Sequence, residues 1–96
     1  MASNRKPVAL YGFAYTDDAL TYLEGLPSKK IRRQIKSKIE LLAANPMPPT
    51  CKKLKGITDN DNPVYRIRSG DYRILYVVRS PVIVILDIDD RKDVYK

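Results

Sequence analysis

The stretch that decides the fold runs from residue 64 to residue 76 and reads Val-Tyr-Arg-Ile-Arg-Ser-Gly-Asp-Tyr-Arg-Ile-Leu-Tyr. Apolar and charged residues alternate on both sides of Ser69-Gly70, a pattern typical of a β-hairpin. With Ser69-Gly70 as the turn, we expect Arg66 to lie opposite Arg73. Alternation then predicts a charged face and an apolar face. The charged face would hold Arg66, Arg68, Asp71 and Arg73, and the apolar face Tyr65, Ile67, Tyr72, Ile74 and Tyr76.

The charged face of this hairpin predicts an anionic ligand. Like charges directly opposite each other on a sheet are destabilising, so Arg66 and Arg73 require an anionic neighbour or a bound anion such as a phosphate. The chain carries a formal net charge of +7 and has a pI of about 9.6. Such a charge favours a polyanionic partner, nucleic acid first and an anionic membrane surface second.

Composition indicates one small folded domain. The chain has 96 residues, of which 44% are hydrophobic and 30% charged, as in ordinary globular proteins. We expect a single domain over residues 1–96, with residues 1–7 as a loose N-terminal extension. No segment is apolar for long enough to span a bilayer, and the N-terminus lacks a signal-peptide core. Cys51 is the single cysteine, so no internal disulfide can form, and we expect a cytoplasmic protein without membrane attachment.

Two absences restrict the chemistry. The chain has no histidine, which excludes imidazole acid–base catalysis and histidine-containing zinc sites, and one cysteine cannot form a thiolate cluster. The aspartates near the C-terminus could hold magnesium, but Arg91 and Lys92 lie among them. We therefore expect no metal and no other cofactor.

The remaining pattern predicts a strand followed by two helices. Residues 8–16 are rich in β-favouring residues and predict a strand. Thr16 can cap a first helix that ends at Gly25 and Pro27, and Ser28 can cap a second helix that stops at Asn45-Pro46. The expected apolar stripes are Ala19, Tyr22, Leu23 and Leu26 in the first helix, and Ile31, Ile35, Ile39 and Leu42 in the second.

After the second helix we expect a loop over residues 50–63, then the arginine hairpin and a last strand over residues 82–89. A two-residue turn before that strand would bury Asp87 and Asp89, whereas a three-residue loop over Ser80–Val82 would pair Arg73 with Asp89. The second register is therefore preferred. It gives a sheet with two helices on one face and the arginines on the other.

This arrangement suggests a chemistry for the arginine face. Guanidinium groups can stabilise a phosphorane-like transition state and order an internal nucleophile, which in RNA is the 2′-hydroxyl. Arginine stays protonated at physiological pH, so proton transfer falls to Tyr95, to Asp89 or Asp90, or to a group of the partner. Asp89 could instead only neutralise Arg73, and Tyr95 could only pack against the domain edge.

The whole pattern from Tyr11 to Tyr95 resembles the RelE/ParE toxins of type II toxin–antitoxin systems. The resemblance rests on four segments, Tyr11-Gly-Phe-Ala-Tyr-Thr16, Cys51-Lys-Lys-Leu-Lys-Gly56, the hairpin at Tyr65–Tyr76, and Asp90-Arg-Lys-Asp-Val-Tyr95, together with Asn45-Pro46. It implies an α+β fold in which two N-terminal helices pack on an antiparallel sheet of about four strands, in the order strand, helix, helix, strand, strand, strand. It also implies a cognate antitoxin that wraps the toxin.

The resemblance implies site residues as well. Arg66, Arg68, Arg73 and Arg91 match basic catalytic positions of the RelE-like nucleases, and Tyr95 matches a tyrosine that stacks on or orients the substrate base. Lys55 matches a basic loop position, and we assign RNA binding to this loop. Its lysines are Lys52, Lys53 and Lys55. Many relatives have His-Arg where this chain has Asp90-Arg91, so the group that moves the proton stays open.

Three functions are compatible with this resemblance. The first is a ribosome-dependent, metal-independent endonuclease that cuts mRNA in the ribosomal A site. The second is a ParE-like inhibitor of DNA gyrase without enzymatic activity, and the third is a basic nucleic-acid-binding module without toxicity. The joint presence of the arginines and Tyr95 favours the endonuclease.

Overall fold

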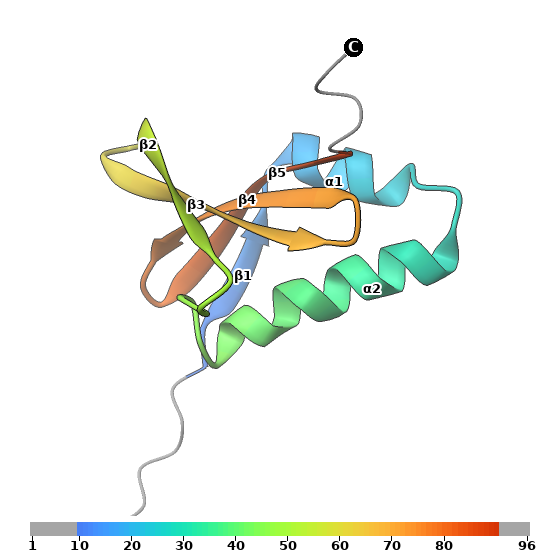
Figure 1. Ribbon diagram of the computed structural model, residues 1–96, viewed down its shortest axis with the longest axis horizontal. Helices are drawn as coiled ribbons and strands as arrows, with labels where there is room; N and C mark the ends of the chain where they lie inside the picture. Colours follow the sequence, from blue (N-terminus) through green and yellow to red (C-terminus); the bar gives the residue numbers. More distant parts are fainter. Residues whose placement is uncertain (1–9, 91–96) are drawn as a thin grey trace, which may run out of the picture.

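The structure, a computed structural model, describes residues 10–90 and consists of two α-helices on one face of a five-stranded sheet (Figure 1). The strands lie in the order β1-β5-β4-β3-β2. The elements are β1 (Gly12–Tyr15), α1 (Asp17–Glu24), α2 (Lys29–Glu40), the short 3₁₀ helix η2 (Leu41–Ala43), β2 (Lys52–Asp59), β3 (Asn62–Ser69), β4 (Tyr72–Arg79) and β5 (Val82–Asp90). Neither α-helix in this part of the chain is long and apolar enough to cross a membrane.

Both predicted helix starts are confirmed. The Thr16 hydroxyl oxygen accepts a hydrogen bond from the backbone N–H of Ala19 at 3.1 Å, and Ser28 accepts one from Ile31 at 3.2 Å. These bonds satisfy backbone donors that the first turn of a helix leaves without partners. The helices therefore begin where short polar side chains can cap them.

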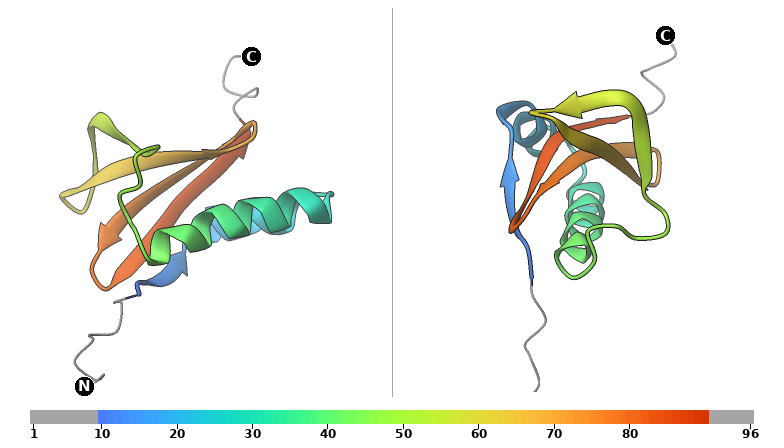
Figure 2. Two further views of the ribbon diagram at one scale, coloured as in Figure 1. Left: turned by 60° about the horizontal axis from the view of Figure 1, so that its bottom comes forward. Right: turned by 90° about the vertical axis from the view of Figure 1, so that its left-hand side faces the viewer.

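The core fills the space between the helices and one face of the sheet (Figure 2). Ile35 and Ile39 of α2 and Ile74 of β4 have no exposed surface. The other buried members are Ala19, Leu23, Leu26, Leu42, Ile67, Tyr76, Ile83, Ile85 and Ile88. The apolar stripes predicted for the two helices thus face the sheet, and the α+β class is confirmed.

The β3–β4 hairpin turns at Gly70-Asp71, one residue later than expected. Ser69 pairs with Tyr72, and Arg68, not Arg66, lies opposite Arg73. Gly70 takes a φ of +61°, and a glycine with positive φ at the first central position is the pattern of a type II′ turn. Each β3 residue therefore pairs with a β4 residue two positions further along the chain than expected. Because this shift is an even number of residues, the division into an arginine face and an apolar face is unchanged.

The β4–β5 hairpin reaches the predicted pairing by another route. A two-residue turn pairs Arg79 with Val82, and a β-bulge at Leu86 then shifts the register so that Arg73 pairs with Asp89. The expected three-residue loop is therefore wrong, although the Arg73–Asp89 pairing is confirmed. The extra residue of the bulge reverses the alternation of side chains along β5. Ile85 before the bulge and Ile88 after it therefore both face the core.

Residues 50–63 do not form the expected loop, because Lys52–Asp59 form the edge strand β2. Its pairing with β3 is irregular between Lys53 and Thr58, and Gly56 within this segment has a φ of +73°. The strand ends in a two-residue turn, Asn60-Asp61, in which both residues have positive φ, as a type I′ turn requires. Because β2 is irregular, its polar and apolar residues do not alternate, and the sequence pattern did not indicate a strand here.

The sheet is mixed and has one strand more than expected. β1 lies parallel to β5, with Phe13 beside Ile83 and Tyr15 beside Ile85, whereas the other pairs are antiparallel. A strand over residues 8–16 was expected, so the additional strand is β2, and five strands replace the expected antiparallel sheet of about four.

Candidate functional site

Three of the predicted arginines share the face of the sheet that the helices leave free. Arg66 and Arg68 flank Ile67 on β3, and the Ile67 side chain points into the core with the helices. Alternation therefore sends Arg66 and Arg68 to the opposite face, where Arg73 of β4 lies directly across from Arg68. Arg68 is exposed, and Arg66 and Arg73 are half-buried. We call these three residues the arginine face.

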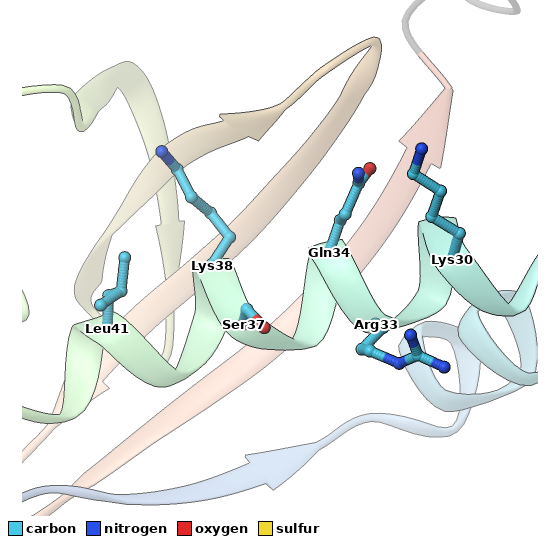
Figure 3. Close-up of a pocket in the computed structure, with 6 residues that line it drawn as sticks. All are labelled: Lys30, Arg33, Gln34, Ser37, Lys38 and Leu41. Atoms are coloured by element: carbon cyan, nitrogen blue, oxygen red, sulfur yellow. The ribbon is translucent and has the colours of Figure 1, made fainter.

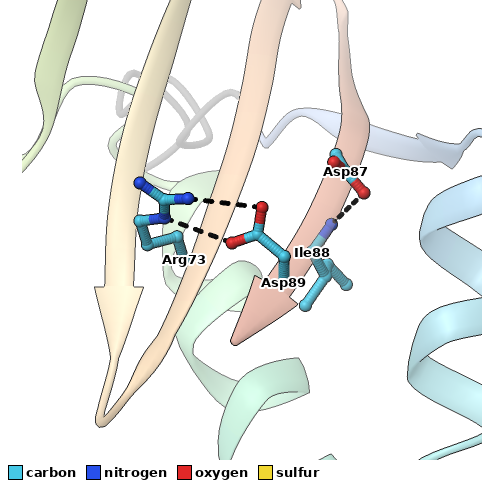
Figure 4. Close-up of polar contacts among 4 residues, drawn as sticks. All are labelled: Arg73, Asp87, Ile88 and Asp89. Atoms are coloured by element: carbon cyan, nitrogen blue, oxygen red, sulfur yellow. Dashed lines mark hydrogen bonds and ion pairs between the residues drawn. The ribbon is translucent and has the colours of Figure 1, made fainter. Parts of the chain in front are cut away.

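An ion pair fixes the central arginine of this face. Arg73 Nε donates to Asp89 Oδ1 at 3.1 Å, and Arg73 Nη2 lies 3.5 Å from Asp89 Oδ2 (Figure 4). Because both carboxylate oxygens face one edge of the guanidinium, the contact orients the planar group as well as neutralising it. Within residues 10–90, Arg73 Nη1 donates no hydrogen bond and neither Arg66 nor Arg68 forms an ion pair.

Asp87 is a second carboxylate beside this ion pair, and it holds the bulge. Its Oδ1 accepts a hydrogen bond from the backbone N–H of Ile88 at 2.9 Å (Figure 4), and the Thr16 hydroxyl donates to the carbonyl of Leu86 at 2.7 Å. Burial raises the pKa of Asp87, with smaller contributions from the charges of Asp89 and Asp18. The Ile88 N–H and the Arg73 charge act in the opposite direction.

The raised pKa of Asp87 gives a prediction for stability against pH. A carboxyl group whose pKa is raised by folding destabilises the fold once it ionises, so stability falls as pH rises from the unfolded pKa through the folded one. Asp87→Asn keeps an oxygen that can accept from Ile88, and we expect a larger free energy of unfolding than wild type at pH 7. The difference should shrink below the ordinary value of 3.8. Urea unfolding at several pH values checks this, and a pH-independent difference would contradict it.

Two of the predicted arginines also line a hollow at the edge of the sheet. This basic hollow has a volume of about 340 Å³ and is lined by Lys38, Thr50, Lys52, Arg66 and Arg68. No carboxylate is among these described lining residues, so the hollow has a strongly positive potential and suits an anion. Of the three predicted RNA-binding lysines, only Lys52 lines it, because Lys52 pairs with Arg66 in the sheet whereas Lys53 pairs with Tyr65. Lys53 and Lys55 are exposed on β2.

Sequence reasoning does not single out Thr50, and it gives Lys38 only as part of a cationic run on the second helix, which could be a solvated exterior or a contact surface for backbone phosphates. Lys38 is one of six cations of the second helix, and its spacing alone does not distinguish it from the others. Only the packing of α2 beneath β3 brings Lys38 to the sheet edge. The same side chain lines a larger open hollow of about 450 Å³ along α2, where Lys30, Gln34, Lys38 and Leu41 project from one side of the helix (Figure 3).

Three other predicted site residues remain. Arg91 and Tyr95 lie outside the described residues. Asp90 ends β5 and pairs with Tyr72 in the sheet, at the same end as the arginine face. No three His, Cys, Asp or Glu side chains within residues 10–90 are grouped so that they could hold a metal ion.

Comparisons with known proteins identify the class. Residues 13–95 match the family model described as the ParE toxin of the type II toxin–antitoxin system parDE. A protein of Methanocaldococcus jannaschii assigned as toxin RelE1 is 36% identical over 76 residues, which are 77% of this chain and 82% of that protein. The chain therefore belongs to the RelE/ParE superfamily of toxins of type II toxin–antitoxin systems.

Solved structures of similar proteins agree with this assignment. The fold is similar to that of RelE in the archaeal RelE–RelB complex of Pyrococcus horikoshii, with a TM-score of 0.70, 31% identity and coverage of 85% of this chain and 96% of that one. It is also similar to the isolated E. coli RelE toxin, with a TM-score of 0.64, 26% identity and coverage of 83% of each chain. Two helices on one face of a sheet are thus a shared architecture.

Proposed function

We propose that this protein is an endonuclease that cuts mRNA in the ribosomal A site, without a metal ion, and that a cognate antitoxin neutralises it. The observation that carries the proposal is the arginine face, on which Arg66, Arg68 and Arg73 lie together and Asp89 orients Arg73. Three cations with one carboxylate partner among the described residues leave an excess positive charge for a phosphate. The similarity to proteins named RelE supports the nuclease branch of the superfamily.

The reaction uses the RNA as its own nucleophile. The 2′-oxygen forms a bond to the neighbouring phosphorus, the bond from phosphorus to the 5′-oxygen breaks, and the products are a 2′,3′-cyclic phosphate and a 5′-hydroxyl. Negative charge gathers on the phosphoryl oxygens in the transition state, where preorganised guanidinium groups stabilise it. One proton leaves the 2′-hydroxyl and another reaches the 5′-oxygen.

The ion pair with Arg73 makes Asp89 a weaker candidate for proton transfer. Both oxygens of Asp89 face Arg73, so Asp89 acts as a positioning residue for the guanidinium and is poorly placed to take a proton as well. That leaves Tyr95, Asp90 or a group of the ribosome for the acid and base steps. A missing internal base would explain dependence on the ribosome.

The proposed partners follow from the same comparison. The P. horikoshii relative was crystallised in a complex with RelB, and we propose that an antitoxin of comparable role binds this chain. We place the protein in the cytoplasm, where it would meet ribosomes and where Cys51, a free thiol in this structure, would stay reduced.

A ParE-like inhibitor of DNA gyrase is the second candidate, because the matching family model is the one described as the ParE toxin. Such an inhibitor needs a surface for gyrase and has no need of an oriented guanidinium. The two functions can therefore be separated by what happens to transcripts.

Expression of the protein should arrest growth and cut translated messages, because the arginine face stabilises the transition state but contains no base. Primer extension after a brief induction should show cuts in register with codons and 5′-hydroxyl ends, whereas purified protein should barely cut free RNA. Intact transcripts together with blocked gyrase supercoiling in vitro would show instead that the second candidate is right.

Tyr95 can be tested by two substitutions. If its ring stacks on an unpaired base, Tyr95→Ala should lose on the order of 1–3 kcal/mol of binding while Tyr95→Phe keeps most of it. If the phenol also transfers a proton, Tyr95→Phe should slow the chemical step nearly as much as Tyr95→Ala. Single-turnover cleavage on ribosomes separates the two roles. Wild-type rates for both variants would mean that Tyr95 only packs.

A further inference from the structure

A second hollow adjoins the basic hollow at the edge of the sheet. This apolar hollow has a volume of about 200 Å³ and shares Lys38 and Thr50 with the basic hollow. Its remaining lining is apolar and consists of Leu41, Leu42, Pro48, Pro49 and Ile67. A cationic compartment and an apolar one therefore meet at two common residues.

The fold explains why the two hollows lie side by side. The pairing of β2 with β3 begins at Lys52 and Arg66. Ile67 and Arg68, the next residues of β3, therefore have no partner residue on β2. The segment between η2 and β2 runs from the end of α2 to this edge of the sheet (Figures 1 and 2). Pro48 and Pro49 of this segment line the apolar hollow together with Leu41 and with the buried residues Leu42 and Ile67.

The pairing of these compartments fits the two halves of a nucleotide. A phosphate suits the basic hollow, whose described lining contains four cations and no carboxylate. A splayed base presents flat apolar surface, which can lie against Pro49 and against Leu41, a side chain that is 69% exposed. The Thr50 hydroxyl at the junction can donate a hydrogen bond to an oxygen of the ribose or phosphate.

We propose that these two hollows form a subsite for one unpaired nucleotide of single-stranded RNA, with its phosphate in the basic hollow and its base in the apolar hollow. The subsite deepens the proposed nuclease function and rests on it. Arg66 and Arg68 belong to both the arginine face and the basic hollow, so a nucleotide bound here is held beside the phosphate that reacts. The site adds base-dependent affinity on the described surface, apart from any stacking by Tyr95.

The test measures binding, with probes that cannot be cut. One probe is a single-stranded RNA trinucleotide in which every ribose is 2′-O-methylated, and the other is the same sugar–phosphate backbone without bases. Wild-type protein should bind the intact probe about fivefold more tightly, because the base removes apolar surface from water. Leu41→Ala should lower this ratio and leave binding of the abasic probe unchanged. Leu10→Ala is the matched control, since Leu10 is 66% exposed and does not line either hollow.

Lys38→Ala tests the phosphate half. It should weaken both probes equally and lower the slope of log affinity against log salt by about 0.7, the value for one phosphate contact on a single strand. Lys36→Ala should change neither quantity, because residues two apart lie on opposite sides of a helix, and Lys36 faces Tyr15 and Glu24 instead. Both substituted lysines are outside the core, so the fold should survive.

Four outcomes would overturn the subsite. The first three are equal binding of the two probes by wild-type protein, the same behaviour of Leu41→Ala and Leu10→Ala, and the same behaviour of Lys38→Ala and Lys36→Ala. The fourth is loss of antitoxin binding with unchanged RNA binding in Leu41→Ala and Lys38→Ala, which would assign the hollows to the antitoxin. A protein that binds the probes as expected but never cuts a message refutes the nuclease and leaves the subsite intact.

Discussion

Arg73→Ala should lower the single-turnover rate of mRNA cleavage on the ribosome by about a hundredfold or more, since removing one oriented donor from a developing oxyanion costs several kcal/mol. Arg73 is the arginine of the described face that an ion pair fixes, so its guanidinium needs little reorganisation when the phosphate arrives. The free energy of unfolding should change little, because the Arg73 side chain points away from the core that the helices cover.

Arg79→Ala is the matched control for this substitution. Arg79 lies at the other end of the same strand, exposed beside the turn to β5, and is six residues from Arg73, or roughly 20 Å along a strand. The Arg79→Ala variant should cut mRNA at the wild-type rate. A wild-type rate for Arg73→Ala would remove this residue from the site, and an equal loss in both variants would mean that general positive charge, not position, is responsible.

Ile74→Ala should destabilise the protein by about 2–5 kcal/mol, through lost burial and the cavity that remains. Ile74 is the next residue after Arg73, has no exposed surface and lies opposite Ile67 within the core. Urea unfolding monitored by circular dichroism measures the effect. The matched control is Ile57→Ala on β2, whose side chain is 52% exposed and should cost far less.

The two neighbouring substitutions together test the division of β4 into two faces. Arg73→Ala should remove activity and keep stability, whereas Ile74→Ala should remove stability and keep the activity of the molecules that stay folded. Similar losses of stability in Ile74→Ala and Ile57→Ala would contradict the position of the core.

Local rules predict much of this fold. Thr16 and Ser28 cap the helices because short polar side chains satisfy first-turn donors, and this depends only on nearby residues. The faces of β3 and β4 follow from a two-residue alternation that survives the shift of the turn to Gly70-Asp71. The pairing of Arg73 with Asp89 follows from the cost of burying a carboxylate.

Other features depend on contacts between distant parts of the chain. The bulge at Leu86 is held by the Thr16 hydroxyl, 70 residues away, and no local pattern announces that bond. β2 is recognisable only beside β3, because its irregular pairing removes the alternation that would mark a strand. A better clue was available at Asn60-Asp61, since asparagine and aspartate tolerate the positive φ values that a type I′ turn needs.

The candidate site also combines residues that the sequence pattern predicts with residues that only the packing brings together. The sequence places Arg66, Arg68 and Arg73 on one face because they lie in two adjacent strands. It does not predict that Lys38 of α2 joins Lys52 and the arginines in the basic hollow, because that requires the angle at which the helix crosses the sheet. Residues brought together by packing are those that periodicity alone leaves out.

The central claim is that the arginine face promotes attack by a 2′-hydroxyl of ribosome-bound mRNA. The most direct test uses purified protein and ribosomes that hold a defined message, with either ribose or 2′-deoxyribose at the one nucleotide before the cut. We predict cleavage of the ribose message to a 2′,3′-cyclic phosphate and a 5′-hydroxyl, and no cleavage of the deoxyribose message. Equal cleavage of both messages, or of neither, would contradict the claim.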